Sequence, residues 1–287
     1  MADPTARDDA PPEIFDRTRR RRRRDRAAAR FDDHAFLIDA IGDEILDRLD
    51  DTTRTFTDAL DLGCHDGRLG TRLAARGMTV TSADAGHRFS TMSGGVQCDE
   101  DRLPFADHSF DLVVSAGVLD QVNDIPGALA LVRRVLRPDG LFLAGFVGAG
   151  SLTVLRDALL AADIAADRGV AARTHPQIDV RAAGDLLHRI GFRLPVADSV
   201  RLGVRYGDLV KLIHDLRGMA STNLLADGGR SPITRTGLAA MRARFAAGAD
   251  PDGRRAETFE LLFMSGWAPE PGVPLPPPPA FRGARLG

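Results

Sequence analysis

Hydrophobic residues divide the chain into a helical first part and a mixed second part. Along residues 13–50 the apolar positions recur at three- and four-residue steps, which predicts a helix with one buried face. After Asp50, short apolar runs of strand length alternate with amphipathic stretches of helix length. The predicted strands cover 57–62, 78–83, 95–98 (a weak strand), 110–115, 141–147, 192–202 and 257–267. The predicted helices after Asp50 cover 68–76, 124–136, 151–166, 180–190, 206–219 and 235–245.

This alternation predicts an α/β fold with a parallel sheet that has helices on both faces. The run at 110–115 is apolar almost throughout, which is typical of a central strand covered on both sides. We therefore divide the chain into a disordered lead-in (1–12), a helical segment (13–50), a main domain (51–267) with a helical insertion at about 203–255, and a proline-rich tail (268–287).

The charge of the chain is unevenly distributed. The formal net charge is only −2, which excludes a strongly basic protein. Residues 13–30 nevertheless contain nine arginines against three acids, so this segment alone is about +6. Clustered guanidinium groups can bind nucleic acid or an acidic partner, but no aromatic residues are interleaved with this run. We expect a solvated helix end that contacts a partner, and no nucleic acid.

Several classes of protein are not indicated by the sequence. The longest uncharged stretch, 140–155, has 16 residues and falls short of the roughly 20 apolar residues of a membrane span. The first residues are acidic and lack the apolar core of a signal peptide, so we expect a cytoplasmic protein. Cys64 and Cys98 are expected to be buried thiols. The histidines show no metal-ligand spacing, and we expect no metal site.

The clearest chemical motif is ALDLGCHDGRLG at 59–70, which predicts a strand, a glycine turn and a helix. Gly63 and Gly67 lack a Cβ, so a ligand can approach the backbone, and the helix that follows offers free N–H groups. Asp84 ends the second predicted strand, where a carboxylate can accept both hydroxyls of a ribose. Together these residues predict a nucleotide-type pocket, although the spacing lacks the three glycines of a dehydrogenase.

With LPF at 103–105 and PDG at 138–140, the motifs resemble those of class I S-adenosylmethionine-dependent methyltransferases of the type 11 branch. The resemblance implies a doubly wound, seven-stranded, mostly parallel Rossmann-like sheet with an N-terminal helical extension and a helical insertion before the last strand. It also implies S-adenosylmethionine as the cofactor, with Asp84 on the ribose and Asp99 on the adenine. The residues implied in binding it are Asp61, Gly63, Cys64, Gly67, Asp84, Asp99, Glu100 and Ser115.

Four further segments are similar to the BioC-like branch, which includes malonyl-acyl-carrier-protein methyltransferases. They are IFDRTRRRRRRDRAAARF (14–31), VNDIPGAL (122–129), LLHRIGF (186–192) and LIHDLRGMASTN (212–223). They also resemble a subgroup of complex I assembly factors understood to hydroxylate an arginine on an iron–sulfur subunit. Because a doubly wound sheet places its crevice beyond the strand ends, we expect residues 203–255 and the arginine-rich helix to close over the cofactor and select the acceptor.

The chain departs from the family pattern at several positions near the implied cofactor. His65 replaces the central glycine of the loop, and we expect an ordinary negative φ there because Gly67 already allows a left-handed turn. Asp120 and Gln121 replace a histidine and an aromatic residue at the place where methyl donor and acceptor meet, and Gly150 replaces an acid. The candidate catalytic residues are Asp120, Tyr206 and Asp215.

Three functions remain open from the sequence. The first is methyl transfer to a small-molecule, carrier-bound or protein acceptor, which needs little acid–base help because the sulfonium is already activated. The second is arginine hydroxylation of a respiratory-complex subunit, for which the sequence shows no mechanism, since oxygen chemistry normally needs a metal or redox cofactor. The third is a non-catalytic module that binds cofactor and docks through its arginine-rich helix.

Overall fold

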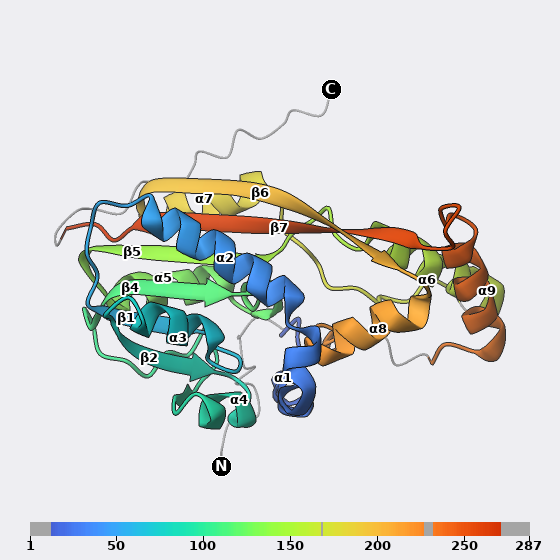
Figure 1. Ribbon diagram of the computed structural model, residues 1–287, viewed down its shortest axis with the longest axis horizontal. Coiled ribbons are helices and arrows are strands. Elements are labelled where there is room, and N and C mark those ends of the chain that lie inside the picture. The colour runs from blue at the N-terminus through green and yellow to red at the C-terminus, as the bar shows by residue number, and fades with distance from the viewer. Residues whose placement is uncertain (1–12, 168, 227–231, 271–287) are drawn as a thin grey trace, which may run out of the picture.

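The computed structural model describes residues 13–167, 169–226 and 232–270. The expected lead-in, and the tail beyond residue 270, lie outside these residues. The described chain forms one seven-stranded sheet with helices on both faces (Figure 1). Its strands are β1 (Asp58–Leu62), β2 (Thr79–Asp84), β3 (Val96–Gln97), β4 (Phe110–Ala116), β5 (Leu136–Val147), β6 (Arg193–Tyr206) and β7 (Arg255–Trp267).

The strand order is β3-β2-β1-β4-β5-β7-β6. Strands β1 to β5 pair in parallel, whereas β7 runs antiparallel between β5 and β6. The fold class predicted from the sequence is therefore confirmed. The order reverses direction between β1 and β4, and in such sheets ligands bind beyond the carboxyl ends of the strands at this point.

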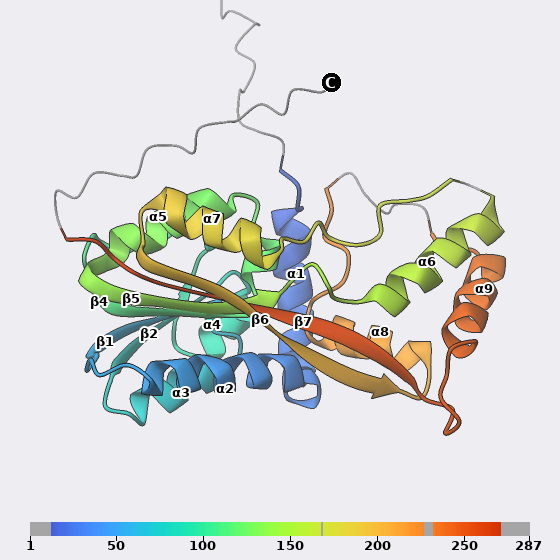
Figure 2. The ribbon, with the colours of Figure 1, turned by 90° about the horizontal axis from the view of Figure 1, so that it is seen from above.

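The helices cover both faces of this sheet. In chain order they are α1 (Arg17–Ala27), α2 (Phe36–Asp50), α3 (Arg68–Ala74), α4 (His87–Met92), α5 (Ile125–Val135), α6 (Thr153–Ala166), α7 (Val180–Ile190), α8 (Leu209–Gly218) and α9 (Arg235–Ala246), with short 3₁₀ segments at Ala28–His34 and Leu119–Gln121. Helices α2 and α3 lie on one face, and α5 and α7 lie on the other (Figure 2). Each face buries its own cluster, with Ile41 and Ile45 in one and Leu129 and Val132 in the other.

Side chains of the sequence set where several helices begin. Asp16, Asp124, Asp179 and Asp208 each accept a hydrogen bond from a backbone N–H of the first turn, as does the Thr234 hydroxyl. Such N-caps satisfy donors that have no partner inside the helix, and each typically stabilises it by about 1 kcal/mol.

The first predicted helix is broken in the structure. A 3₁₀ segment at Ala28–His34 separates α1 from α2, with Arg30 at φ −140° and ψ 23°. Helix α2 then packs on the sheet, whereas α1 crosses beyond the carboxyl ends of the parallel strands (Figures 1 and 2). The arginine run is therefore only partly a solvated helix end, because Arg20 and Arg24 are buried.

The second half of the chain also differs from the sequence expectation in its boundaries. Strand β6 continues to Tyr206, so this residue ends a strand instead of opening a helix. Strands β6 and β7 extend beyond the rest of the sheet, and α6, α8 and α9 gather at that end (Figure 2). The short helix α4, which we did not predict, buries Phe89 and Ser90. Among the described helices, none is long and apolar enough to cross a membrane.

Candidate functional site

The turn after β1 has a left-handed backbone at three positions. Gly63 and Gly67 lie at φ 79° and 82°, as their lack of a Cβ allows. His65 lies at φ 50°, so the expected negative φ is wrong. A left-handed backbone costs a non-glycine residue about 1–2 kcal/mol, so contacts of the histidine ring must offset this strain.

The ring of His65 is held on three sides. It stacks on Phe31 with a centroid distance of 4.8 Å, and its Nε2 lies 2.9 Å from the Ala116 carbonyl oxygen. Burial, with the nearby Arg24 charge, lowers the pKa of His65 to about 3. The neutral ring can therefore donate from Nε2 to Ala116 and accept at Nδ1 from Arg24 Nη2, which is 3.3 Å away.

Four of the predicted cofactor-binding acids gather where strands β1 to β3 end. Asp61 and Asp84 belong to β1 and β2, and Asp99 and Glu100 follow β3. All four are at most 1% exposed. The structure thus brings together acids that are up to 39 positions apart in the sequence (61 to 100), as parallel strands that end at one edge require.

Helix α1 supplies the cations that face these acids. Arg24 Nε donates to Asp84 Oδ1 at 2.7 Å, and Arg24 Nη2 donates to Asp84 Oδ2. Arg20 donates from both terminal nitrogens to Glu100, at 2.6 and 2.7 Å. Neither pair could be predicted from the sequence, because the partners are 60 and 80 positions apart.

The same helix face continues this contact toward its N-terminus. Arg17 donates to both oxygens of Asp101 at 2.6 and 2.7 Å, and Arg21 donates to Asp99 at 2.6 Å. Positions 17, 20, 21 and 24 share one side of a helix because they are three and four residues apart. We call these four arginines the inner face of α1.

The two central aspartates differ in their charge environment. Burial opposes ionisation of Asp84, but Arg24 outweighs it and holds the pKa of Asp84 below its usual range. Asp61 has no such cation among the residues that the structure describes. Burial raises the pKa of Asp61 to about 7, and the charges of Asp84 and Asp66 add to this, although the Gly70 N–H that donates to its Oδ2 opposes it.

The raised pKa of Asp61 predicts a pH-dependent stability. A carboxyl whose pKa is higher in the folded protein binds more protons when folded, so the free energy of unfolding falls as pH rises from about 4 to 7. The Asp61 carboxyl contributes a fall of about 1.4 kcal/mol for each pH unit between its unfolded and folded pKa values. We expect Asp61→Asn to remove this contribution from the pH dependence. Urea unfolding between pH 4 and 8 measures it. The exposed Asp185→Asn is the control, and an unchanged slope in Asp61→Asn would contradict the assignment.

The remaining predicted cofactor residues lie around this turn. The Cys64 thiol is buried beside the Ser93 hydroxyl at 3.3 Å, and burial raises its pKa. The Ser115 hydroxyl and one oxygen of Asp99 are buried with no hydrogen-bond partner among the described residues. Such orphaned groups are typical of a place where a ligand completes the hydrogen bonds.

The three candidate catalytic residues do not form one group, although Tyr206 and Asp215 adjoin each other. Asp120 follows β4 and borders a cavity between the sheet and the insertion. Tyr206 is buried at the end of β6, where burial and the charge of Asp215 raise its pKa. Asp215 on α8 lies 2.9 Å from His34 Nδ1. Of the three, only Asp120 lines the cavity.

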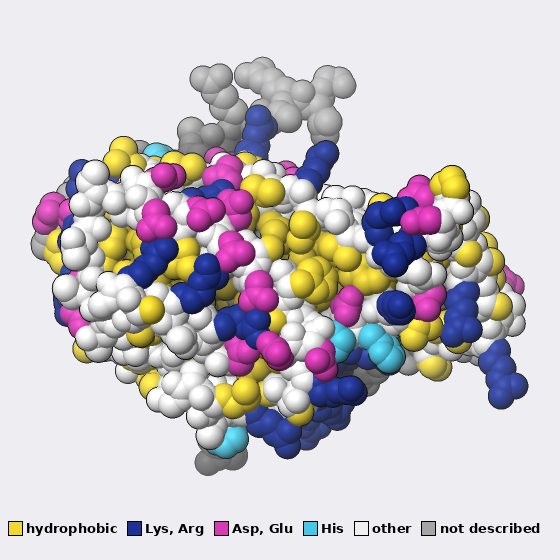
Figure 3. Space-filling model, viewed as in Figure 1, with side chains coloured by type: hydrophobic (Ala, Val, Ile, Leu, Met, Phe, Trp, Pro, Cys, Tyr) yellow, Lys and Arg dark blue, Asp and Glu magenta, His cyan; other side chains and the backbone are white. Residues whose placement is uncertain are grey.

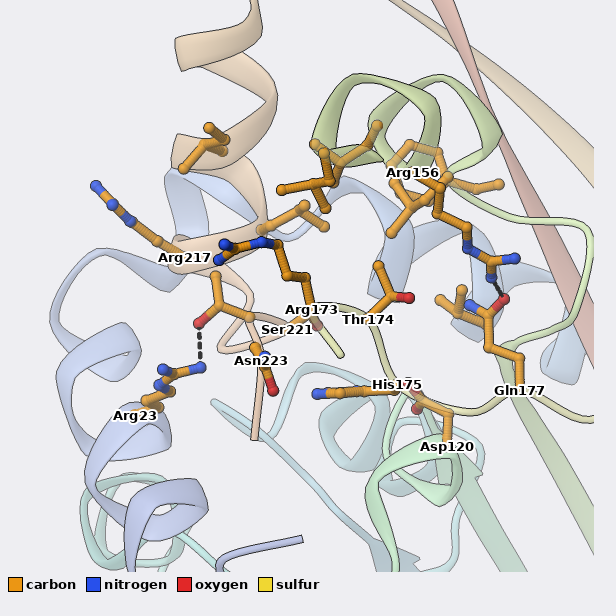
Figure 4. Close-up of a pocket in the computed structure, with 18 of the residues that line it drawn as sticks. Arg23, Asp120, Arg156, Arg173, Thr174, His175, Gln177, Arg217, Ser221 and Asn223 are labelled. Carbon is orange, nitrogen blue, oxygen red and sulfur yellow. Dashed lines mark hydrogen bonds between the residues drawn. The ribbon is translucent and has the colours of Figure 1, made fainter. Parts of the chain in front are cut away.

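The cavity has a volume of about 450 Å³, within the range of small-molecule sites. One wall is apolar and includes Leu155, Leu216 and Phe259. Basic and polar side chains line the rest of the cavity (Figure 4), with Arg156 beside the apolar residues and the Arg217 guanidinium directed away from the other labelled side chains. The labelled residues are Arg23, Asp120, Arg156, Arg173, Thr174, His175, Gln177, Arg217, Ser221 and Asn223.

Three arginines that line the cavity, Arg23, Arg156 and Arg217, have no acidic partner within the part of the chain that the structure describes. Arg23 Nη1 donates to the Thr222 hydroxyl at 2.6 Å, and Arg156 donates to Gln177. By contrast, Arg173 is paired with Asp163 at 2.6 Å. Our sequence analysis missed this arginine set, since its members come from α1, α6 and α8, and only the similarity of 212–223 to relatives pointed to Arg217.

Asp120 stands between the cavity and the inner face of α1. Burial raises its pKa to about 7, while the charges of Arg20 and Arg24 oppose this. A carboxyl with a pKa near neutrality can accept a proton from an acceptor group at physiological pH. Among the described residues, no group of three or more His, Cys, Asp or Glu side chains is placed to hold a metal ion.

Known proteins resemble this chain over most of its length. Residues 60–144 match the family described as "Methyltransferase domain". The mitochondrial arginine-hydroxylase NDUFAF5 of Danio rerio is 32% identical over 266 residues, covering 89% of this chain and 83% of the relative. Malonyl-acyl-carrier-protein O-methyltransferase of Methylovorus sp. (strain MP688) is 30% identical over 285 residues, covering 92% and 93%. The chain belongs to the class I S-adenosylmethionine-dependent methyltransferase family.

Solved structures of methyltransferase-like proteins share the fold. A putative methyltransferase from Bacillus halodurans matches with a TM-score of 0.55 at 12% identity, over 79% of this chain and all of its own. The YcgJ protein from Bacillus subtilis matches with a TM-score of 0.54 at 14% identity, over 80% and 98%.

S-adenosylmethionine is the cofactor of this methyltransferase family, and the chain has hydrogen-bonding groups of the right kind to hold it. Asp84 ends β2, Asp99 follows β3, the turn after β1 contains Gly63 and Gly67, and Ser115 has a free hydroxyl. The Asp84 carboxylate is nevertheless already paired with Arg24. Arg24 occupies the Asp84 carboxylate, so a ribose can reach it only after this arginine has moved.

Proposed function

We propose that this methyltransferase transfers the methyl group of S-adenosylmethionine to an anionic small-molecule or carrier-bound acceptor held in the 450 Å³ cavity. The observation that supports it is that Arg23, Arg156 and Arg217, which have no acidic partner among the described residues, line a cavity together with apolar side chains. Guanidinium groups bind carboxylates and phosphates through paired hydrogen bonds, and an apolar wall favours a hydrocarbon part.

In this proposal the residues of the chain position and desolvate the reactants. Asp84, Asp99 and Ser115 hold the cofactor, whose activated sulfonium supplies the methyl group. Arg156 and Arg217 orient the anionic group of the acceptor, and Leu155 and Phe259 exclude water. Asp120 lies where the two sites adjoin and accepts the proton when the acceptor atom carries one.

A second function is favoured by the 32% identity to arginine-hydroxylase NDUFAF5 over 89% of the chain. In that case the acceptor is an arginine of a respiratory-complex subunit, and the product differs in composition. Methyl transfer adds one methylene group to the mass of the product, whereas hydroxylation adds one oxygen atom.

The experiment that tests the proposal measures methyl transfer directly. We expect the protein, given S-adenosylmethionine with a labelled methyl group, to label a malonyl-acyl-carrier-protein probe and to release S-adenosylhomocysteine. Arg217→Gln should raise the KM for the probe by about 10-fold or more, as expected for loss of a charged contact, with little change in cofactor affinity. Arg242→Gln, on the exposed side of α9, is the matched control.

The outcomes separate the candidates. Labelling of the probe supports methyl transfer to an acid. Equal KM values for the Arg217→Gln and Arg242→Gln variants would contradict binding of the acceptor in the cavity. A product that gains an oxygen atom, found by mass spectrometry of proteins captured from the native cell, supports hydroxylation instead. A chain that binds S-adenosylmethionine in calorimetry but yields neither a methylated nor an oxygenated product favours the non-catalytic docking module.

A further inference from the structure

The inner face of α1 uses the same carboxylates that the family uses for its cofactor. Arg24 faces Asp84, Arg21 faces Asp99, and Arg20 faces Glu100. These pairs are buried or partly buried, so they are not the screened contacts of a solvated surface. These carboxylates therefore already have partners, and the partners are guanidinium groups of α1.

The Asp84 carboxylate has no hydrogen-bonding capacity left for a second ligand. It accepts from Arg24 Nε and Nη2, from the His65 N–H at 3.0 Å and from the Gly86 N–H at 2.7 Å. A carboxylate offers about four lone-pair sites, so these four donors saturate it. Asp84 is also 0% exposed, which leaves no space beside it for even a water molecule. Ribose hydroxyls and Arg24 are mutually exclusive at this residue.

The helix itself, and not just one side chain, lies close to the loop after β2. A Cβ built on Gly86 would lie 2.8 Å from the Arg24 Cβ, and the Arg88 N–H donates to Asp25 at 2.9 Å. Arg20 lies between Glu100 and Asp120, whose pKa responds to its charge. With α1 in this position, its arginines stand between the cofactor acids and the cavity.

The face of α1 that points away from the acids carries like charges, which repel one another. Arg23, Arg26, Arg30 and Arg217, with His34, line a second hollow of about 400 Å³ between α1 and α8, and basic side chains gather over α1 in Figure 3. Burial and the charges of Arg19, Arg26 and Arg217 lower the pKa of Arg23. Like charges thus crowd one face of α1 while carboxylates attract the other, so the position of α1 depends on the acids of the cleft.

We propose that α1 is an internal competitor of S-adenosylmethionine: it closes the cofactor site with the guanidinium groups of Arg20 and Arg24, and it leaves those acids when the cofactor binds. The proposal rests on the proposed cofactor function of Asp84 and Asp99. Cofactor affinity is then reduced by the fraction of molecules in which α1 has left the cleft. Release of α1 also joins the cofactor acids to the cavity, where the two reactants must meet.

The first experiment uses the unmodified chain and hydrogen–deuterium exchange of the backbone amides. We expect saturating S-adenosylhomocysteine to speed exchange in residues 17–27 by about 10-fold or more while it slows exchange in the turn at 63–67. Slower or unchanged exchange in 17–27, together with protection of 63–67, would overturn the competition and leave cofactor binding intact.

The second experiment measures S-adenosylhomocysteine affinity by calorimetry in two matched variants. Arg24→Met removes the guanidinium that occupies Asp84, and we expect the affinity to rise at least about 10-fold. Arg22→Met changes an exposed arginine of the same helix, and we expect no change. Equal affinities in both variants and the unmodified chain would overturn the proposal.

The two experiments also separate this proposal from the proposed function. No binding by either the unmodified chain or Arg24→Met, with both shown to be folded by circular dichroism, would contradict cofactor binding itself and with it the competition. If only the Arg24→Met variant binds S-adenosylhomocysteine, the result supports a competition in which α1 closes the site almost completely in the unmodified chain.

Discussion

Replacing Arg24 by methionine is expected to lower the free energy of unfolding of the cofactor-free protein by about 3–5 kcal/mol. Arg24 is 1% exposed and Asp84 is 0% exposed, and the arginine supplies two of the four hydrogen bonds to this carboxylate. Without it, Asp84 is left charged in a desolvated place. Chemical denaturation at neutral pH measures the loss, with Arg22→Met as the control on the exposed side of the helix.

The double variant Arg24→Met, Asp84→Asn tests the cause of that loss. Removing both charges takes away the uncompensated carboxylate, so we expect the double variant to recover most of the stability lost by Arg24→Met. If Arg24→Met lowers the free energy of unfolding no more than Arg22→Met does, the Arg24–Asp84 pair does not hold α1 in place. Equal loss in the single and double variants would point to packing instead of charge.

Replacing Gly63 by alanine is expected to destabilise the protein by about 2–5 kcal/mol, through two separate effects. Gly63 lies at φ 79°, where an L side chain costs about 1–2 kcal/mol. Its Cβ would also lie 2.4 Å from Val118 Cγ2, so the side chain or the turn must move, and such overpacking typically costs about 1–3 kcal/mol. Denaturant unfolding gives the sum.

A matched glycine separates the two effects. Gly77 lies at φ 89° with nothing within 4 Å of its Cβ position, so Gly77→Ala reports backbone strain alone. In a double-mutant cycle, Val118→Ala should restore the part of the stability lost by Gly63→Ala that comes from the clash with Val118. If Gly63→Ala and Gly77→Ala cost the same, the space beside Gly63 is not filled as the structure describes.

The physical pattern of the chain was sufficient for most of the fold. Alternating apolar runs and amphipathic stretches predicted the α/β sheet because burial on both faces forces this periodicity. Predictions failed where local sequence has weak preferences. The 3₁₀ break at Ala28–His34 lies in a segment whose composition suits a continuous helix, and Tyr206 stays in β6 because it pairs with Arg255 of β7.

The sequence by itself determined which acids meet, because Asp61 and Asp84 lie at the ends of β1 and β2, Asp99 follows β3, and the carboxyl ends of these strands share one edge. Only the tertiary structure decided what those acids bind. Helical spacing places Arg17, Arg20, Arg21 and Arg24 on one face, but not which surface that face will contact. That choice depends on two features. The break after α1 turns the helix across the strand ends. Burying an arginine is costly unless a carboxylate pairs with it, so the buried arginines lie where the acids are. The left-handed backbone of His65 has the same origin, since its strain is offset by Phe31 and Ala116, residues far from it in sequence.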